Sequence, residues 1–118
     1  MIYVSNAFSL SMLDREQQRK DLARGRSNGF PRIPYPVEYP RKWIQDRYGT
    51  FGQVVSIIGH ADVAAVISSA LGLDLKQNRK SVVLTDHDVL LVAQYIGPRL
   101  EEGTTRLPGG ARIEWWAV

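Results

Sequence analysis

The chain has 118 residues, which suits one compact domain with a single hydrophobic core. It has no cysteine, so disulfides, thiolate metal ligands and a cysteine nucleophile are excluded. The net charge is +3, and the excess lies in residues 14–53, where nine Lys and Arg face five Asp and Glu, against six and seven elsewhere. This stretch either faces a polyanion or forms a solvated basic surface, and its composition does not separate the two.

The chain begins with Ile2–Val4, which has the composition of a short strand. Asn6 or Ser9 is expected to cap a turn or helix that follows it. Asp14, with a glutamine three positions later, then predicts the start of a polar helix that ends near Gly25.

The next part of the chain, about residues 24–50, is basic and rich in proline and aromatic residues. This composition resists regular structure until about Trp43, and it predicts a long ordered loop. Its aromatic residues argue against disorder. Two interpretations remain open: a lid over a bound ligand, or a rigid loop that packs its aromatic side chains on its own subunit or a dimer interface.

The second half of the chain alternates strand and helix patterns. Phe51–Ile58 has strand character, and apolar residues from Val63 to Leu71 recur at three and four positions, which predicts a helix ended by Gly72. The remaining predicted strands are Ser81–Thr85, Val89–Ile96 and Arg112–Val118, the first two joined by a turn at Asp86–Asp88. The sequence thus predicts one α/β domain over residues 1–118, with a mixed sheet of about five strands and helices packed on it.

Three polar stretches lie where these elements begin or end: Ser5–Ser9, Ile58–His60 and Pro98–Gly103. They place polar and ionisable side chains at the ends of strands and helices rather than in the hydrophobic core. His60 follows glycine at a strand-to-helix turn, where free backbone N–H groups favour a phosphate. The alternative is a histidine that simply caps the helix.

Arg99 and Glu102 stand three residues apart after Gly97-Pro98, so a turn would put them on one side. Arginine can hold a phosphate by two parallel hydrogen bonds, and a carboxylate can orient a histidine. The alternative is an exposed ion pair, which contributes little. Arg79 is a second candidate phosphate ligand or else a surface arginine.

Asn6 and Ser9 offer neutral hydrogen-bonding groups, with local capping as the alternative. His87 lies in the predicted turn and is expected to be exposed. The sequence has no convincing metal cluster, no Gly-x-Ser-x-Gly elbow and no P-loop. A phosphodiesterase without these devices could use RNA, whose 2′-hydroxyl lies beside the scissile phosphate.

As a set, these motifs resemble the viral ring nuclease family. The resemblance covers about the first dozen residues and everything from Val54 onward, but not the basic segment between them. Its motifs are Ser5–Leu10 with Met12-Leu13, then Ile58–His60, Gln77–Arg79 and Arg99–Gly103.

The resemblance implies a homodimer that closes over cyclic tetra-adenylate and cleaves it without a metal or other cofactor. The products would be linear di-adenylate with 2′,3′-cyclic phosphate ends, and the effect would be to antagonise type III CRISPR defence. His60 would be the general acid and Glu102 its orienting partner. Arg99 and Arg79 would bind phosphate, and the ligand pocket would include Asn6, Ser9 and Gly59.

No apolar run approaches the ~20 residues of a membrane span, and the first residues do not resemble a signal peptide. We therefore expect no membrane partner and a cytoplasmic protein, in the host cell if a virus or mobile element encodes it. Duplex DNA is not an expected partner. The alternative function is a non-catalytic protein that binds and sequesters a cyclic oligonucleotide or another nucleic acid.

Overall fold

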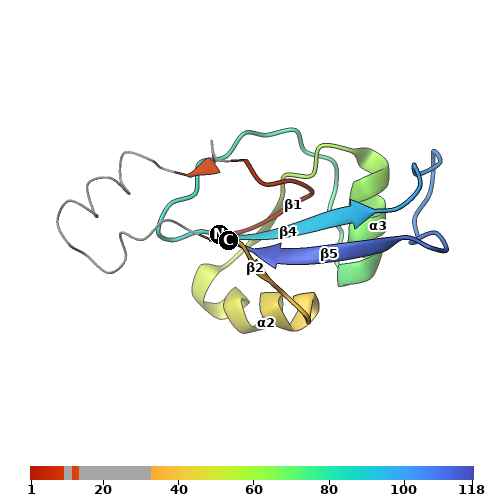
Figure 1. The fold of residues 1–118 in the computed structure, drawn as a ribbon. Coiled ribbons are helices and arrows are strands. Elements are labelled where there is room, and N and C mark those ends of the chain that lie inside the picture. Colours follow the sequence, from red (N-terminus) through yellow and green to blue (C-terminus); the bar gives the residue numbers. More distant parts are fainter. Residues whose placement is uncertain (10–11, 14–32) are drawn as a thin grey trace.

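The computed structural model describes residues 1–9, 12–13 and 33–118. A five-stranded sheet, in the order β2-β5-β4-β1-β3, forms the centre of the fold (Figure 1). The strands are β1 (Ile2–Ser5), β2 (Tyr35–Pro36), β3 (Val54–Ser56), β4 (Val89–Ile96) and β5 (Arg112–Ala117). The two described helices are α2 (Pro40–Phe51) and α3 (Ala61–Leu71). The predicted α/β domain with a mixed five-stranded sheet is therefore confirmed.

Strand direction divides the sheet into two parts. β1 runs parallel to both of its neighbours, with Ile2 opposite Val54 of β3 and Val89 of β4. β5 is antiparallel to β4 and to the edge strand β2. Because β3, β1 and β4 are parallel, their carboxyl ends lie at the same edge of the sheet, where ligands of open α/β sheets commonly bind.

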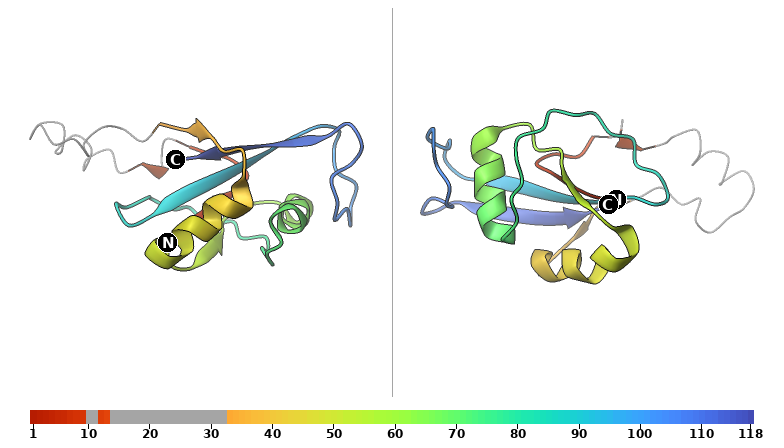
Figure 2. Two further views of the ribbon diagram at one scale, coloured as in Figure 1. Left: turned by 90° about the horizontal axis from the view of Figure 1, so that it is seen from below. Right: turned by 180° about the vertical axis from the view of Figure 1, so that it is seen from behind.

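Both helices cover the same face of the sheet (Figure 2). Ile44 of α2 and Ile67 of α3 belong to one apolar cluster with strand residues such as Val4 and Leu91. Ile67 and Leu91 are fully buried. The period-2 alternation of β4 sends its other residues, Leu90 and Val92, to a second cluster on the opposite face.

The predicted loop between residues 33 and 42 is wrong, because this stretch contributes regular structure. Tyr35 and Pro36 pair with the end of β5, and proline fits this position because β2 is an edge strand. Pro40 then occupies the first turn of α2, where its missing N–H costs no hydrogen bond. Trp43 is only 7% exposed, and its indole Nε1–H donates to the Tyr35 hydroxyl at 3.2 Å.

Trp43 thus packs on its own subunit, whereas Tyr35, Tyr39 and Tyr48 are exposed, so both interpretations of the segment stay predictions. Arg41 also contacts its own subunit, because its Nε donates to the Ala70 carbonyl of α3 at 2.8 Å. The part of the segment before residue 33 lies outside the described residues, as does the helix predicted from Asp14 to Gly25.

Ser81–Thr85 is not a strand, although its composition predicted one. Leu84 forms an isolated parallel bridge with Leu13 and is buried, whereas Val83 is 54% exposed. β-branched composition alone does not make a strand where the backbone has no partner along its length. The predicted number of strands is still correct, because β2 takes the place of this run.

The turn before β4 agrees with its prediction, and His87 is exposed as expected. Asp88, by contrast, is buried, and its Oδ2 accepts hydrogen bonds from the Thr85 N–H at 2.9 Å and hydroxyl at 3.0 Å. Burial would raise the pKa of Asp88, but these hydrogen bonds and the nearby amino-terminal ammonium group outweigh it and hold the pKa below its ordinary value. The ionised carboxylate therefore stabilises this turn.

The other predicted elements are confirmed with shifted ends. The strand predicted over Phe51–Ile58 is limited to β3, because α2 continues to Phe51 and Gly52 ends it with a φ of 79°. Gly72 ends α3 in the left-handed conformation, as predicted. None of the described helices combines the length and the apolar character needed to cross a membrane.

Candidate functional site

The topology brings the three polar stretches together at one edge of the sheet. The first follows β1, the second follows β3, and the third follows β4, so each begins at the carboxyl end of one of the three parallel strands. A direct contact links the first two, because the Gly59 N–H donates to Asn6 Oδ1 at 3.3 Å. The second and third line a common pocket.

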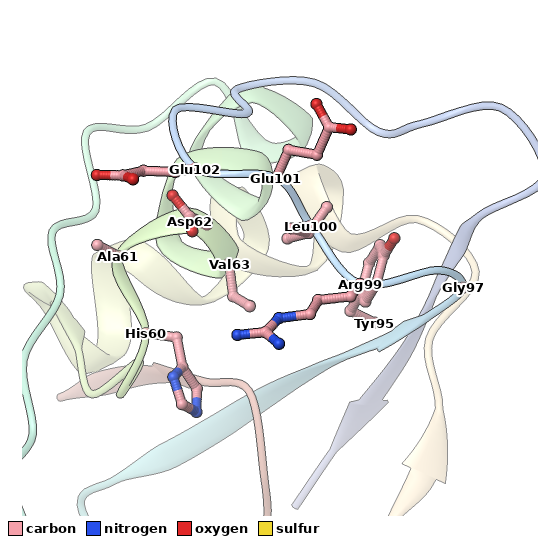
Figure 3. Close-up of a pocket in the computed structure, with 10 residues that line it drawn as sticks. All are labelled: His60, Ala61, Asp62, Val63, Tyr95, Gly97, Arg99, Leu100, Glu101 and Glu102. Carbon is pink, nitrogen blue, oxygen red and sulfur yellow. The ribbon is translucent and has the colours of Figure 1, made fainter.

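His60 lies immediately before α3, at the N-cap position, which is the strand-to-helix turn expected from the sequence. Its backbone is extended, with φ −129° and ψ 132°, and its carbonyl accepts the first helical bond, from Ala64 N–H at 2.9 Å. The imidazole makes no capping hydrogen bond. The simple capping role is therefore absent, and the exposed imidazole faces the pocket instead (Figure 3).

The pocket has a volume of about 1190 Å³. The loop after β4 supplies Arg99, Glu101 and Glu102 to its wall, together with Leu100. The beginning of α3 supplies the opposite wall, including Asp62 and Val63. A cavity of this size and mixed character can hold part of a nucleotide ligand.

Specific hydrogen bonds hold the loop against α3. Asp62 Oδ1 accepts from the Gly103 N–H at 3.3 Å, and the Ser69 hydroxyl donates to the Thr105 carbonyl at 2.7 Å. At the start of the loop, the Tyr95 hydroxyl donates to the Pro98 carbonyl at 2.5 Å. These contacts fix the loop that carries Arg99 and Glu102 beside the start of α3, so both residues line one pocket with the distant His60.

The charged groups of the pocket are separated in space. Figure 3 shows the Arg99 guanidinium extending toward the His60 imidazole, while the Glu101 and Glu102 carboxylates point away from it. Among the described residues, no hydrogen bond or ion pair engages the side chains of His60, Arg99 or Glu102. The positive charge of the Arg99 guanidinium therefore lies at the end of the pocket that holds His60 (Figure 3).

The orienting contact expected between Glu102 and the imidazole is not among the contacts of the described residues. The two residues do line the same pocket, as their sequence positions suggested. The role of Glu102 stays a prediction.

The other predicted site residues are placed differently. Arg79 uses its Nε to donate to the Gly59 carbonyl at 2.9 Å, so it lies beside the entry to α3 rather than on the pocket wall. Asn6 makes the contact with Gly59 described above, not a local cap, and it also lines a smaller cavity of about 450 Å³ on the other face of the sheet, with Gln94 and Trp116. Ser9 is exposed and is not a lining residue of the His60 pocket.

Two residues that sequence reasoning missed take part in this arrangement: Asp62 and Tyr95. Asp62 was detectable as an acidic residue in the first turn of the predicted helix. Tyr95 carried no comparable signal. Gln77 belongs to a motif of the resemblance but had no assigned role, and its Nε2 donates to the Gly59 carbonyl at 2.9 Å, the same acceptor that Arg79 uses.

No group of three or more His, Asp or Glu side chains within the described ranges is arranged to hold a metal ion. Independence from metals stays a prediction, and chelation tests it directly.

The family of the chain follows from comparison with known protein families. A family model named STIV B116-like matches residues 32–108, which is more than half of the sequence. The chain belongs to the STIV B116-like family. The match includes β2 and α2, so the aromatic segment from residue 33 onward is part of the STIV B116-like domain.

A solved structure from the same family has this fold. B116 of Sulfolobus turreted icosahedral virus superposes with a TM-score of 0.62 and 22% sequence identity, over 98% of this chain and 96% of B116. At this identity the likeness establishes the fold alone. Among curated proteins, none matches this chain.

Proposed function

We propose that this STIV B116-like protein is a ring nuclease that opens cyclic tetra-adenylate without a metal. The products are linear di-adenylate molecules with 2′,3′-cyclic phosphate ends. Removal of this messenger antagonises type III CRISPR defence, and the natural setting is the cytoplasm of a cell infected by a virus or carrying a mobile element. Two findings support a viral setting: the family name and the fold shared with a protein of an icosahedral virus.

One observation carries the proposal: an exposed imidazole without a hydrogen-bond partner among the described residues shares a pocket with an arginine that extends toward it (Figure 3). A histidine that only stabilised the fold would be expected to use its nitrogens in capping or core hydrogen bonds. Here His60 keeps both nitrogens available, and Arg99 supplies the positive charge that a phosphodiester needs beside a proton donor.

The proposed reaction uses the substrate's own 2′-hydroxyl and the same two side chains, Arg99 and His60. The ribose 2′-oxygen attacks the adjacent phosphorus and forms a new O–P bond, its proton passes to solvent, and the P–O5′ bond breaks. Arg99 holds the charge that develops on the non-bridging oxygens. The protonated His60 imidazole donates its proton to the departing 5′-oxygen, and neutral imidazole then takes up a proton from water.

The symmetry of the proposed ligand favours a homodimer for this reaction. A cyclic tetranucleotide can present two equivalent phosphates across a two-fold axis. A second copy of the chain, related by the same axis, supplies a second His60 and a second Arg99, so each pocket meets one of these phosphates.

Replacement of each of the two histidines tests the assignment. His60→Ala is expected to lower the single-turnover cleavage rate of cyclic tetra-adenylate by about 10²-fold or more, the scale of a lost general acid. His87→Ala is the matched control, since this exposed histidine lies in the turn before β4, and its rate should equal that of the parent.

Binding of the uncut ring separates the competing functions. If His60→Ala binds the ring but does not cut it, the histidine acts in chemistry. If the parent protein binds the ring tightly and never cuts it, the protein is a sequestering binder instead. A His60→Ala variant that cleaves at the parental rate contradicts the proposed role.

A further inference from the structure

The peptide groups on either side of Gly59 are held by three side chains from three different parts of the chain. Asn6, after β1, accepts the Gly59 N–H at 3.3 Å. Gln77 and Arg79, both in the connection after α3, donate to the Gly59 carbonyl at 2.9 Å each. Both hydrogen-bonding groups of this residue are thereby used.

These hydrogen bonds fix the path of the backbone between β3 and α3. Ile58, directly before Gly59, is fully buried, and His60, directly after it, is exposed. The Gly59 carbonyl belongs to the peptide that ends at the His60 nitrogen. A rotation of that peptide changes the direction of the His60 Cα–Cβ bond, and so moves the imidazole relative to Arg99.

The connection that carries Gln77 and Arg79 is itself fixed to the end of β3. Asn78 N–H donates to the Ile58 carbonyl at 2.8 Å, and its side-chain Nδ2 donates to the Ser56 carbonyl at 2.8 Å. The Ser56 hydroxyl donates to the Lys76 carbonyl at 2.6 Å. Gln77 therefore reaches Gly59 from a short segment whose backbone is bonded on both sides.

The steric surroundings of Gly59 do not explain its position by themselves. Among the described residues, a methyl group here would meet only the Arg79 Cγ, at an ordinary contact distance of 3.9 Å. The position of the turn thus depends on polar contacts rather than on close packing. Hydrogen bonds from amide and guanidinium donors have well-defined directions, which suits them to orienting a peptide.

We propose that Gln77 is a positioning residue for His60. Together with Arg79 and Asn6 it clamps the Gly59 peptide groups, so that the imidazole enters the pocket facing Arg99. For Arg79 this adds a positioning role through Nε to the phosphate-binding role expected from the sequence. The effect on catalysis rests on the proposed function, whereas the clamp itself does not.

The first test is kinetic and uses the full chain. Gln77→Leu removes one of the two donors to the Gly59 carbonyl. We expect kcat for cyclic tetra-adenylate to fall about tenfold, less than the ~10²-fold cost of a 1 Å misplacement because Arg79 still donates, while KM changes less than about twofold. Gln77→Lys, which keeps a donor on a side chain of similar reach, should recover most of the rate. Lys80→Gln is the matched control from the same exposed connection and should behave as the parent.

The second test does not depend on turnover. In NMR spectra, the ring signals of His60 should shift in Gln77→Leu, because the imidazole leaves its place beside Arg99, and the Gly59 amide should exchange faster with solvent. The ring signals of His87 serve as the reference within the same spectrum and should not change.

The outcomes separate this inference from the proposed function. A parent protein that never cleaves the ring contradicts the nuclease, and the NMR comparison then decides on the clamp alone. Unchanged His60 signals and an unchanged Gly59 amide in Gln77→Leu overturn the clamp. Equal losses in Gln77→Leu and Gln77→Lys also overturn it, because they show that the donor is not what matters.

Discussion

The close approach of two chain segments at Gly97 gives the most specific prediction for the loop that carries Arg99 and Glu102. Gly97 follows β4, and a Cβ atom placed on it would lie 2.6 Å from the Ala111 Cβ, 2.9 Å from its Cα and 3.1 Å from the Tyr95 hydroxyl. Carbon atoms in contact are normally about 3.5–4.0 Å apart, so the segment before β5 would have to move.

Gly97→Ala is therefore expected to destabilise the protein by about 1–3 kcal/mol, the usual cost of forcing a methyl group into a closely packed site. For a domain of this size the melting temperature should fall by roughly 4 °C or more. The cleavage rate should also fall, because the displaced loop positions Arg99. Thermal unfolding followed by circular dichroism, at one fixed protein concentration, measures the first effect.

Gly109→Ala, in the same loop, is the matched control, because its added Cβ would meet no heavy atom within 4 Å. Its stability should stay within about 0.5 kcal/mol of the parent. If Gly97→Ala melts together with Gly109→Ala and the parent, the close approach to Ala111 does not exist in solution, and the reasoning about the loop is refuted.

Three further predictions concern the site, the turn before β4 and the aromatic segment. Glu102→Ala should slow cleavage less than His60→Ala does. If the two residues act as a unit, the double variant should be hardly slower than His60→Ala. Strictly additive effects in single-turnover kinetics would count against that coupling. Because the folded-state pKa of Asp88 is lowered, the stability it contributes is present above its unfolded pKa of about 3.8 and is lost as pH falls through the folded value. In chemical denaturation at pH 7, Asp88→Asn should thus have a lower free energy of unfolding than the parent, and this difference should shrink below pH ~4. A difference that does not change with pH would refute the pKa argument. Trp43→Ala should cost about 3–5 kcal/mol, whereas Tyr39→Ala, 67% exposed, should cost little; equal unfolding midpoints would contradict the scaffold role of α2.

Much of the fold could be predicted because several elements have a clear hydrophobic period. β4 carries a continuous run of buried residues, and α3 has apolar residues at helical spacing and a glycine at its end. β2 and the start of α2 were missed because proline usually signals a break. At Pro36 and Pro40 it occupies an edge strand and a helix start, the two positions where proline is tolerated.

The strand predicted at Ser81–Thr85 shows the opposite error. Its composition favours a strand, but a strand also needs a neighbour, and sequence composition does not report whether one is available. Within the described part of the chain, Leu84 alone of this run has a bridge partner, Leu13.

For the site, sequence order predicted that His60 and Arg99 lie at one edge of the sheet, but not the contacts of the individual side chains. Each polar stretch follows a strand, and parallel strands bring their carboxyl ends together, so the shared pocket of His60 and Arg99 follows from topology. The hydrogen bonds of Asn6 and Arg79 to Gly59 depend on side-chain geometry across long sequence separations. No local pattern encodes such contacts.

The proposed function requires that the purified protein cleaves a cyclic oligoadenylate without a metal. The most direct measurement is incubation of the purified chain with labelled cyclic tetra-adenylate in excess EDTA, followed by separation of the products. We expect linear di-adenylate with 2′,3′-cyclic phosphate ends, formed at the same rate with and without the chelator. An intact ring after prolonged incubation with excess protein would contradict the nuclease, and cleavage abolished by EDTA would contradict the metal-independent mechanism.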